Sequence, residues 1–370
     1  MINLFTVHMP SSVIRPLLDT LFSGFIGQGK KVDEFEKALV PWMQNRNVLT
    51  LNSGTAGLHL ALRLAGVGRG DEVVSTPQTC QATNQPILYA GAKPVWADIN
   101  PMTGNIDPGD IEHRITAKTK AILCVHLGGN PCDLDEINDI GERHGIPVIE
   151  DAAHALGAFY KGKRIGSVSN FTMFSLQAIK HITTIDGGIL TTRSEDDYKR
   201  GKLLRWYGMN REDTREMRCL ADVPEYGNKW HMNDICATIG IEQLNYLDGI
   251  LAKHRDNANF YNLEFDARRF KRVRRLQYSN DALSSFWLYT TLVDDRQAFV
   301  EFMKKKDIHA SRVHTRNDTH TCFAESRPKT ELKGVKEFDD HCVMLPVHWR
   351  VSEQDRRYII DSIAEFDKLK

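Results

Sequence analysis

The sequence lacks the features of a disulfide-bonded, zinc-binding or membrane-spanning protein. Its seven cysteines never occur in C-x-x-C spacing, which argues against disulfide and zinc scaffolds and favours a reducing compartment. No apolar run approaches the ~18 residues that a membrane span needs, and the N-terminus lacks the basic and apolar regions of a secretory signal. We therefore expect a cytoplasmic protein with no bound metal and no membrane partner.

An excess of charge of one sign is also missing. Lysine plus arginine and aspartate plus glutamate number 48 each, so the chain has no overall field that would attract nucleic acid. Its length of 370 residues and its hydrophobic fraction of 41% suit a globular protein with two domains. We expect a large domain over 1–252 and a smaller α+β domain over 253–370, where the composition becomes more basic.

Strand-like and helix-like segments alternate over the first 150 residues. This order predicts an α/β fold with a mostly parallel sheet, helices on both of its faces, and ligands at the carboxyl ends of the strands. A polar segment over 209–228 is expected to be a loop or a lid, and a long helix is expected to begin near Asn233. The expected early strands are 48–51, 72–75, 94–97, 121–125 and 147–150, and the expected early helices are 56–65, 82–89 and 134–143.

Two stretches imitate well-known binding motifs. From Gly24, G-F-I-G-Q-G-K matches a phosphate loop, but Lys31 replaces the Ser or Thr that would hold magnesium, and a helix is expected before it instead of a strand. A loop that borders the substrate is the alternative, which makes Gly27 a candidate substrate contact. Near the other end of the chain, His314, His320 and Cys322 fit no standard metal-site spacing.

Three polar features lie beside expected strands. The S-G-T run before the 56–65 helix offers free backbone amides for an anion, most naturally a phosphate, or else holds only a helix cap. Asp151 follows a strand and either caps the next turn or holds a cationic group. Lys180 lies between expected strands at 171–175 and 189–192. Desolvation there would lower its pKa and make it a nucleophile, although a surface lysine is the alternative.

Together these features match the needs of pyridoxal phosphate (PLP). Its phosphate needs amides and hydroxyls, its pyridine nitrogen needs a carboxylate, and its aldehyde needs a lysine. The chain also resembles, over nearly its whole length, the DegT/StrS family of PLP-dependent nucleotide-sugar aminotransferases, which have the fold type I of aspartate aminotransferase. The motifs that carry this resemblance include G-Q-G-K-K-V-D-E-F-E-K-A-L, N-S-G-T-A-G-L-H-L-A-L, E-D-A-A-H-A-L-G-A, F-S-L-Q-A-I-K-H-I-T-T-I-D-G-G and G-N-K-W-H-M-N-D-I-C-A.

The resemblance implies a role for each matching residue. Lys180 would bond to the cofactor and then move protons, Asp151 would pair with the pyridinium, and His154 would lie beside the ring. A homodimer is implied, with Asn228 of one subunit reaching the phosphate held by its neighbour. The other implied phosphate contacts are Thr55 and Ala56 through backbone amides, Ser175 and Gln177, and the candidate substrate contacts are Gly27, His314, Arg316 and His320.

Three positions depart from the family pattern. Cys80 stands where an aromatic residue usually stacks on the ring, so either its sulfur packs there or the stacking comes from elsewhere. His231 replaces the arginine that is usual before Met232, and Ile185 replaces a common glycine. The first two departures bear on ring geometry and on the substrate.

The implied reaction moves an amino group from L-glutamate to a nucleotide-linked keto-deoxysugar. The resemblance favours a 4-keto-6-deoxyhexose on GDP, dTDP or UDP, converted to an amino sugar for a surface glycan such as the O-antigen of lipopolysaccharide. A PLP- or PMP-dependent sugar dehydratase on the same fold is one alternative. Some such relatives have a histidine in place of the lysine, and His181 adjoins Lys180 here. A non-catalytic regulatory relative is the other alternative.

Overall fold

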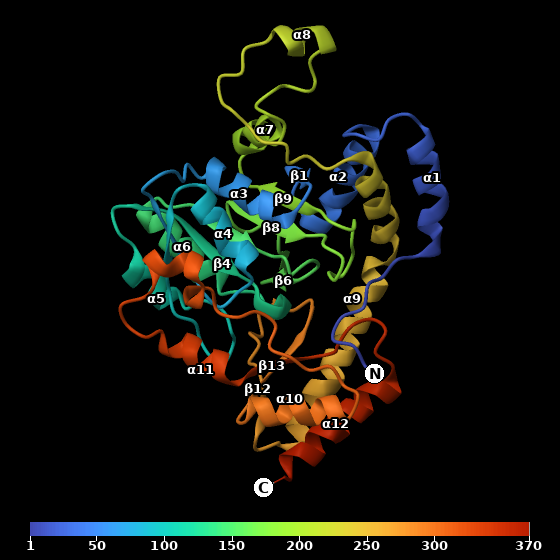
Figure 1. Cartoon of the computed structure of the whole chain (residues 1–370), viewed down its shortest axis with the longest axis vertical. Coiled ribbons are helices and arrows are strands. Elements are labelled where there is room, and N and C mark those ends of the chain that lie inside the picture. Colours follow the sequence, from blue (N-terminus) through green and yellow to red (C-terminus); the bar gives the residue numbers. More distant parts are fainter. Residues whose placement is uncertain (370) are drawn as a thin grey trace.

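A seven-stranded sheet forms the centre of the computed structural model, which describes residues 1–369 (Figure 1). Its strand order is β1-β9-β8-β5-β4-β2-β3, and β9 alone runs antiparallel to its two neighbours, β8 and β1. The mostly parallel sheet predicted from the sequence is therefore present. The strands are β1 (Val48–Leu51), β2 (Glu72–Ser75), β3 (Lys93–Trp96), β4 (Thr119–Val125), β5 (Val148–Asp151), β8 (Phe171–Ser175) and β9 (Gly188–Thr192).

Apolar side chains alternate between the two faces of this sheet. Val74, Ile122 and Val148 belong to one core cluster, whereas Val73 and Ile149 belong to the other. This division is expected because successive strand residues point to opposite faces, and strands covered on both faces are apolar throughout. The helices that cover the first face are α2 (Lys30–Met43), α6 (Leu134–His144) and the first half of α9 (Asp234–Arg268), and those that cover the second are α3 (Gly54–Leu64), α4 (Gln81–Tyr89) and α7 (Glu195–Leu204).

The long helix α9 joins this core to a second one. Leu247 and Leu251 pack into the cluster on the large sheet, whereas Tyr261 and Phe265 pack into a separate cluster around the three-stranded sheet β10-β12-β13. The helix passes without a break through residue 252, so the division expected there stays a prediction. The elements of the second core are β10 (Val273–Arg275), β12 (Tyr289–Val293), α10 (Arg296–Lys305), β13 (Cys342–Leu345) and α12 (Glu353–Asp367).

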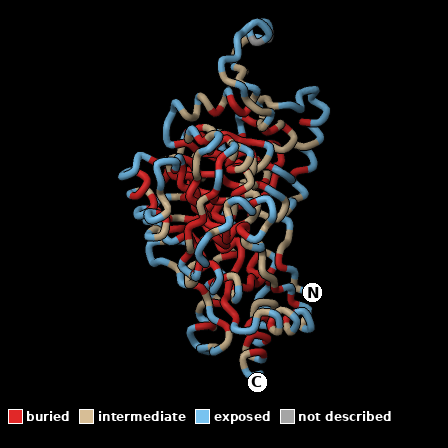
Figure 2. The backbone as a smooth tube through the Cα atoms, turned by 60° about the vertical axis from the view of Figure 1, so that its left-hand side comes forward, coloured by how far each residue is buried: buried red, intermediate tan, exposed pale blue. Residues whose placement is uncertain are grey.

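Shorter elements complete the described chain. The segment expected to be a loop or a lid contains a helix, α8 (Arg215–Leu220), and projects from the body of the molecule, whereas buried backbone is concentrated in the body (Figures 1 and 2). No helix of the described residues is long and apolar enough to cross a membrane. The remaining helices and strands are α1 (Ile14–Phe22), α5 (Pro108–Arg114), β6 (Phe159–Tyr160), β7 (Lys163–Arg164), β11 (Ala282–Leu283) and α11 (Lys333–His341), with 3-10 turns at Ser11–Val13, Leu127–Gly129, Asn317–Thr319 and Thr321–Ser326.

In the stretch that imitates a phosphate loop, the backbone amides bond to the side chain of Asp234. The carboxylate of Asp234 accepts hydrogen bonds from the amides of Gly29 (2.7 Å), Lys31 (3.3 Å) and Val32 (3.2 Å) at the start of α2. A Cβ atom at Gly29 would lie 2.8 Å from that carboxylate, which explains the glycine. An internal anion thus takes the place that a bound phosphate has in a phosphate loop.

Candidate active site

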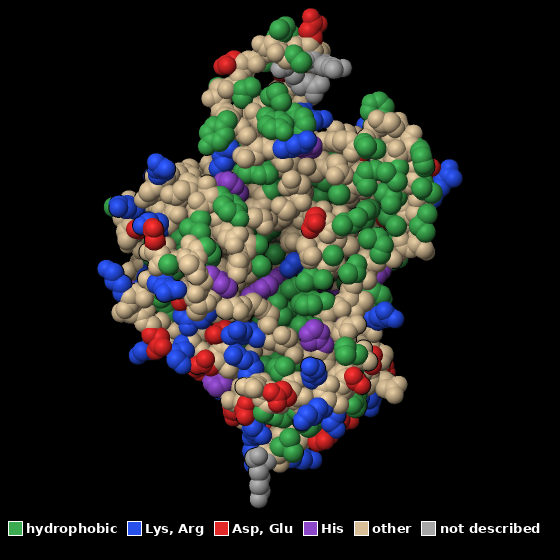
Figure 3. All heavy atoms as spheres, viewed as in Figure 1, with side chains coloured by type: hydrophobic (Ala, Val, Ile, Leu, Met, Phe, Trp, Pro, Cys, Tyr) green, Lys and Arg blue, Asp and Glu red, His purple; other side chains and the backbone are tan. Residues whose placement is uncertain are grey.

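A cavity of about 360 Å³ lies at the carboxyl edge of the large sheet. Parallel strands end there at Val125, Asp151 and Ser175, and the chain after β1 enters α3 at the same edge. In Figure 3, histidine side chains and a Lys or Arg side chain border a hollow near the centre of the visible face. Of the residues predicted from the sequence, the cavity brings together Thr55, Cys80, Asp151, His154, Ser175, Gln177, Lys180 and His314.

Lys180 lies in the loop between β8 and β9, as the sequence predicts. The loop is closed at its base, where Leu176 donates its amide to Gly187 O and Thr184 donates its amide to Leu176 O. The lysine amine opens on the cavity, and burial lowers its pKa to about 8, against the opposing effects of Asp151 and Cys80. A fraction of the amine is therefore unprotonated near neutral pH and able to act as a nucleophile.

Asp151 is the last residue of β5 and is buried. The hydroxyl of Thr83 donates to Oδ2 at 2.6 Å, and the amide of Ala153 donates to Oδ1 at 3.0 Å. Burial raises the pKa of this carboxyl, whereas both hydrogen bonds lower it. These donors orient the carboxylate, which can accept a further hydrogen bond from a cationic group in the cavity.

The start of α3 offers backbone amides to the cavity. Ser53 is the helix cap, and its hydroxyl accepts the amide of Ala56 at 3.1 Å, so the predicted Ala56 contact is already engaged within the chain. The amides of Gly54 and Thr55 have no hydrogen-bond partner among the described residues, as is usual at a helix start, and both residues line the cavity. These two amides and the hydroxyl of Ser175 suit a phosphate.

Three aromatic rings border the same cavity. His154 stacks on Trp287 with ring centroids 3.9 Å apart and an interplanar angle of 12°, and its plane is nearly parallel to that of His314, 6.0 Å away. Nδ1 of His154 and Nε2 of His314 are buried without a hydrogen-bond partner in the part of the chain that the structure describes. Burial is the main cause that lowers the pKa of His154 well below its usual value and that of His314 to about 4, so both rings are neutral.

Trp287, like Gly54 and Thr83, is a site residue that the sequence analysis missed. It precedes β12, more than 100 residues after Lys180, and the only local signal is an apolar run, F-W-L-Y, that is typical of a buried strand. His154 and the Trp287 ring stacked on it line the same cavity as Cys80, the position where the sequence lacks an aromatic residue.

Other predicted site residues lie outside this cavity. Gly27 is exposed in the loop before α2, and the side chain of Asn228 accepts a hydrogen bond from Arg63 near the far end of α3 (3.1 Å). Arg316 forms a two-pronged ion pair with Asp318 (2.8 and 2.6 Å), and His320 contacts Gln81 (2.9 Å). Their predicted roles stay predictions.

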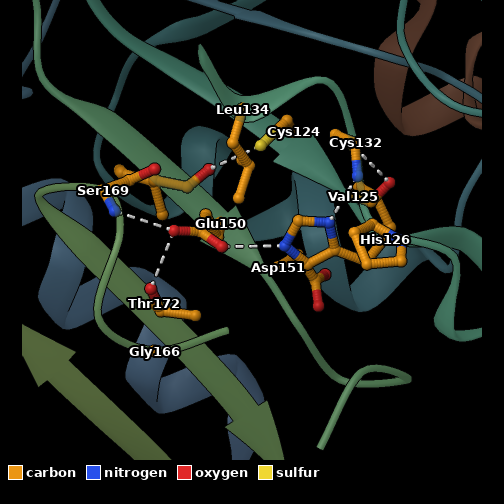
Figure 4. A network of polar contacts seen from close by, with 12 residues as sticks. Cys124, Val125, His126, Cys132, Leu134, Glu150, Asp151, Gly166, Ser169 and Thr172 are labelled. Carbon is orange, nitrogen blue, oxygen red and sulfur yellow. Dashed lines mark hydrogen bonds and ion pairs between the residues drawn. The ribbon is translucent and has the colours of Figure 1, made fainter. Parts of the chain in front are cut away.

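A buried polar network around His126 and Glu150 adjoins Asp151, which lines the cavity (Figure 4). Nε2 of His126 donates to Glu150 Oε2 at 2.8 Å, and the amide of Ser169 and the hydroxyl of Thr172 donate to Oε1. The amide of Cys132 donates to His126 Nδ1 at 3.0 Å, which requires a lone pair on Nδ1 and places the ring proton on Nε2. His126 also donates its amide to Asp151 O, so the network fixes the ends of β4 and β5.

A model of the DegT/DnrJ/EryC1/StrS aminotransferase family matches residues 10–364. The chain belongs to this family. AtS13 from Actinomadura melliaura is a solved structure with 41% sequence identity and a TM-score of 0.94, over 99% of this chain and 98% of AtS13. GDP-perosamine synthase from Caulobacter vibrioides is 36% identical over 91% of this chain and 90% of its own. The PLP-form of Spr1654 from Streptococcus pneumoniae is 29% identical, with a TM-score of 0.90 over 99% and 98% of the two chains.

Membership of the DegT/DnrJ/EryC1/StrS family confirms the predicted family, fold type and aminotransferase activity, and PLP is the cofactor. The cavity fits that cofactor. Two unpartnered amides at the start of α3 suit its phosphate, the oriented carboxylate of Asp151 suits its pyridinium, and the amine of Lys180 suits its aldehyde.

Proposed function

We propose that this aminotransferase moves the amino group of L-glutamate to a nucleotide-linked 4-keto-6-deoxyhexose. The product would be an amino sugar for a surface glycan such as the O-antigen of lipopolysaccharide. The observation that supports this most is that the amine of Lys180 and the carboxylate of Asp151 line one cavity at the start of α3. The likeness to GDP-perosamine synthase supports a nucleotide sugar as the acceptor. The proposed location is the cytoplasm, which the scattered cysteines of the sequence, odd in number and never in C-x-x-C spacing, support.

Each site residue has a proposed role in this reaction. When bound, PLP supplies an aldehyde and a ring that accepts electrons. The amine of Lys180 would be the nucleophile toward that aldehyde. Once free, it would take the proton from the amino-bearing carbon of glutamate and deliver it to the carbon that had been the aldehyde of PLP. It would carry a proton in the opposite direction when the keto-sugar is aminated, a role worth roughly 10²–10⁴-fold in rate. The carboxylate of Asp151 would pair with the pyridine nitrogen of PLP and keep it protonated. The amides of Gly54 and Thr55, with Ser175 and Gln177, hold the phosphate.

The ring of His154 is proposed to lie beside the cofactor ring, with Trp287 behind it. Because His314 is neutral and its Nε2 is buried without a partner, it can exchange a hydrogen bond with a sugar hydroxyl or carbonyl. Its backbone φ of +96° is rare for a residue with a side chain, and such strain tends to occur at functional sites. His314 is therefore the proposed sugar contact.

A labelled donor tests this function. Purified holoenzyme is incubated with ¹⁵N-labelled L-glutamate and one sugar nucleotide. The GDP-, dTDP- and UDP-linked 4-keto-6-deoxyhexoses are tested in separate reactions. We expect one sugar nucleotide to gain ¹⁵N with equal formation of 2-oxoglutarate, and Lys180→Ala to abolish both this transfer and the visible absorbance of the bound cofactor. Lys161→Ala is the control, because Lys161 is an exposed lysine paired with Asp135 outside the cavity.

Three results would contradict the proposal. A deoxygenated sugar without nitrogen would indicate a dehydratase, and a bound cofactor that never reacts with glutamate or with any tested sugar would indicate a regulatory relative. An active Lys180→Ala enzyme would refute the role of that lysine.

A homodimer is the proposed assembly. The chain from residue 7 to residue 26, which includes α1, exposes a run of large apolar side chains, and an apolar surface of this kind favours a protein interface (Figure 3). Asn228 lies outside its own cavity. Its Oδ1 accepts a hydrogen bond from Arg63, but its side-chain N–H groups have no partner among the described residues and could donate to a neighbouring cavity. The exposed apolar residues of this surface are Val7, Met9, Ile14, Leu18, Leu21, Phe22, Phe25 and Ile26.

Mixing two inactive variants tests the shared site. If Asn228 serves the neighbouring subunit, a dimer of one Lys180→Ala chain and one Asn228→Ala chain contains one intact site and one doubly altered site. Random re-association should then restore about a quarter of wild-type activity. If both residues serve the same cavity, the mixture should show no more activity than its two components, which would refute the proposal.

A further inference from the structure

Trp287 contacts both sides of the candidate active site. Its ring lies 3.9 Å from Nζ of Lys180, measured to the ring centroid, and stacks on His154 at the same centroid distance. Its indole N–H donates to the carbonyl of Ile179, the residue just before Lys180, at 2.9 Å. One buried side chain thus touches the amine, the backbone that carries that amine, and the ring of His154.

The chain before Trp287 is fixed by hydrogen bonds to the same two regions. Ser285 donates its hydroxyl to the carbonyl of His154 at 2.7 Å, and its own carbonyl accepts Nε2 of His181 at 3.0 Å. The carbonyl of Phe286 accepts Nδ1 of His254 at 2.8 Å. The position of the indole is therefore set by the residues next to Lys180 and by His154, and these bonds oppose a rotation of the ring away from the amine.

We infer that Trp287 is a positioning residue, which holds the amine of Lys180 against its indole face whenever that amine is not bonded to the cofactor. The inference rests on the proposed role of Lys180. A protonated amine over an aromatic face is attracted by the negative charge of that face, and Trp is the strongest partner of this kind. The indole has no basic atom that could take the proton, so it steadies the ammonium without competing for the proton that the amine must exchange.

Several charged or titratable groups face the Lys180 amine from other elements. Burial lowers the pKa of Lys180, whereas the carboxylate of Asp151 and the thiol of Cys80 raise it. His154 and His314 line the same cavity and are neutral, as is His181 in the lysine's own loop. The indole face acts in the same direction as Asp151, and its removal should lower the pKa of the amine.

The pKa of Lys180 in the cofactor-free full-length chain is the decisive measurement. Competitive acetylation with acetic anhydride across a pH series gives the midpoint at which the amine becomes reactive, from mass spectrometry of the Lys180 peptide relative to that of Lys161. Wild type is compared with Trp287→Phe, which keeps an aromatic face, and with Trp287→Leu, which does not. Trp287→Met replaces the leucine variant if that variant does not fold. Trp42→Leu is the control, because Trp42 packs under Arg164 away from the cavity.

We expect Trp287→Leu to lower the Lys180 midpoint by about 0.5 to 1.5 pH units and Trp287→Phe to lower it by clearly less. Trp42→Leu should leave it unchanged. Equal midpoints in wild type and both Trp287 variants, or equal shifts in the phenylalanine and leucine variants, would overturn the inference, because a purely structural role makes no distinction between them.

A second readout separates this inference from the proposed function. Each holoenzyme is reduced with borohydride, and the cofactor adduct is located by peptide mapping. An adduct on Lys180 in wild type, together with unchanged midpoints in the variants, refutes only the role of Trp287. The absence of an adduct on Lys180 in wild type refutes the proposed function itself.

Discussion

The imidazole of His126 donates to the carboxylate of Glu150 at 2.8 Å, and neither side chain is exposed. Glu150 adjoins Asp151 in β5, so this carboxylate is buried one residue from the carboxylate that faces the cavity. Its charge is tolerated because His126, Ser169 and Thr172 together donate three hydrogen bonds to it. Removal of one partner from a buried charged group leaves that group uncompensated.

We therefore predict that His126→Ala lowers the free energy of unfolding by about 3–5 kcal/mol. Denaturant unfolding of the full chain, followed by circular dichroism, measures the change. Lys161→Ala is the matched control, because it removes one partner of an exposed ion pair. Lys161 and Asp135 lie 2.6 Å apart, and their side chains are 47% and 53% exposed. That change should cost less than about 1 kcal/mol, because water screens an exposed pair. Equal losses in the two variants would contradict the role of burial.

Asp234 offers a second stability test, at the start of α2. Its carboxylate satisfies the amides of Gly29, Lys31 and Val32, which would otherwise lack partners within the helix. Asp234→Ala should lower the free energy of unfolding by about 1–2 kcal/mol, and Asp234→Asn should lower it by less because the amide oxygen still accepts a hydrogen bond. Equal losses in the two variants would show that hydrogen bonding to these amides is not the cause.

The large sheet and half of the site could be predicted because their signals are local. The short apolar runs that became β2, β4 and β5 are bounded by polar turns, and their parallel order follows from the helices between them. Asp151 directly follows such a run, and Lys180 lies between two others. Their meeting at one edge follows from the geometry of parallel strands.

The rest of the site could not be predicted, because it depends on contacts between distant parts of the chain. Trp287 reaches the cavity from beyond α9, and no spacing in the sequence relates it to Lys180. His314 also reaches the cavity from beyond α9, but it was among the predicted substrate contacts. The S-G-T run was expected to hold either a phosphate or a helix cap, but whether the Ala56 amide binds a phosphate or the Ser53 hydroxyl depends on the conformation of one serine side chain. The helix within 209–228 was missed because that segment is polar and shows no apolar period.

Ile185, which stands where the resemblance leads us to expect a glycine, has a backbone conformation that favours glycine. Its φ is +74°, a left-handed conformation that strains a β-branched residue, and its side chain is 57% exposed. Ile185→Gly should therefore relieve strain, lose little burial and raise the free energy of unfolding by about 0.5–2 kcal/mol.

Leu283→Gly is the control for Ile185→Gly, since Leu283 is 46% exposed and lies in strand β11. Glycine should destabilise this site by at least about 0.5–1 kcal/mol, because it adds flexibility to the unfolded chain and removes a partly buried side chain. Thermal and denaturant unfolding of both variants would measure the two changes. A loss of stability in Ile185→Gly similar to that in Leu283→Gly would show that no strain is released.

His254 makes stability depend on pH in the acid range. It is buried in α9, donates Nδ1 to the carbonyl of Phe286, and has its pKa lowered by burial to about 4. Between pH 6.5 and about 4 the unfolded chain therefore binds a proton that the folded chain does not. The stability present above pH 6.5 is lost as the pH falls through this window, at up to about 1.4 kcal/mol per pH unit for one such group. His181 and His154 shift in the same direction.

We predict that the free energy of unfolding of wild type falls steeply from pH 6.5 toward pH 4. His254→Gln should make the slope of this free energy against pH shallower, by the amount that corresponds to one proton fewer taken up on unfolding. The slope is the quantity to compare, because a loss of stability that is the same at every pH does not change it. His113→Gln should leave the slope unchanged, since that ring is exposed in the folded as well as the unfolded chain. Denaturant unfolding at half-unit pH intervals measures all three slopes. An equal slope in His254→Gln and wild type would contradict this prediction. It would mean that the imidazole of His254 takes up a proton as readily in the folded chain as in the unfolded one, so that the packing of α9 against the chain before β12 does not exclude the charge.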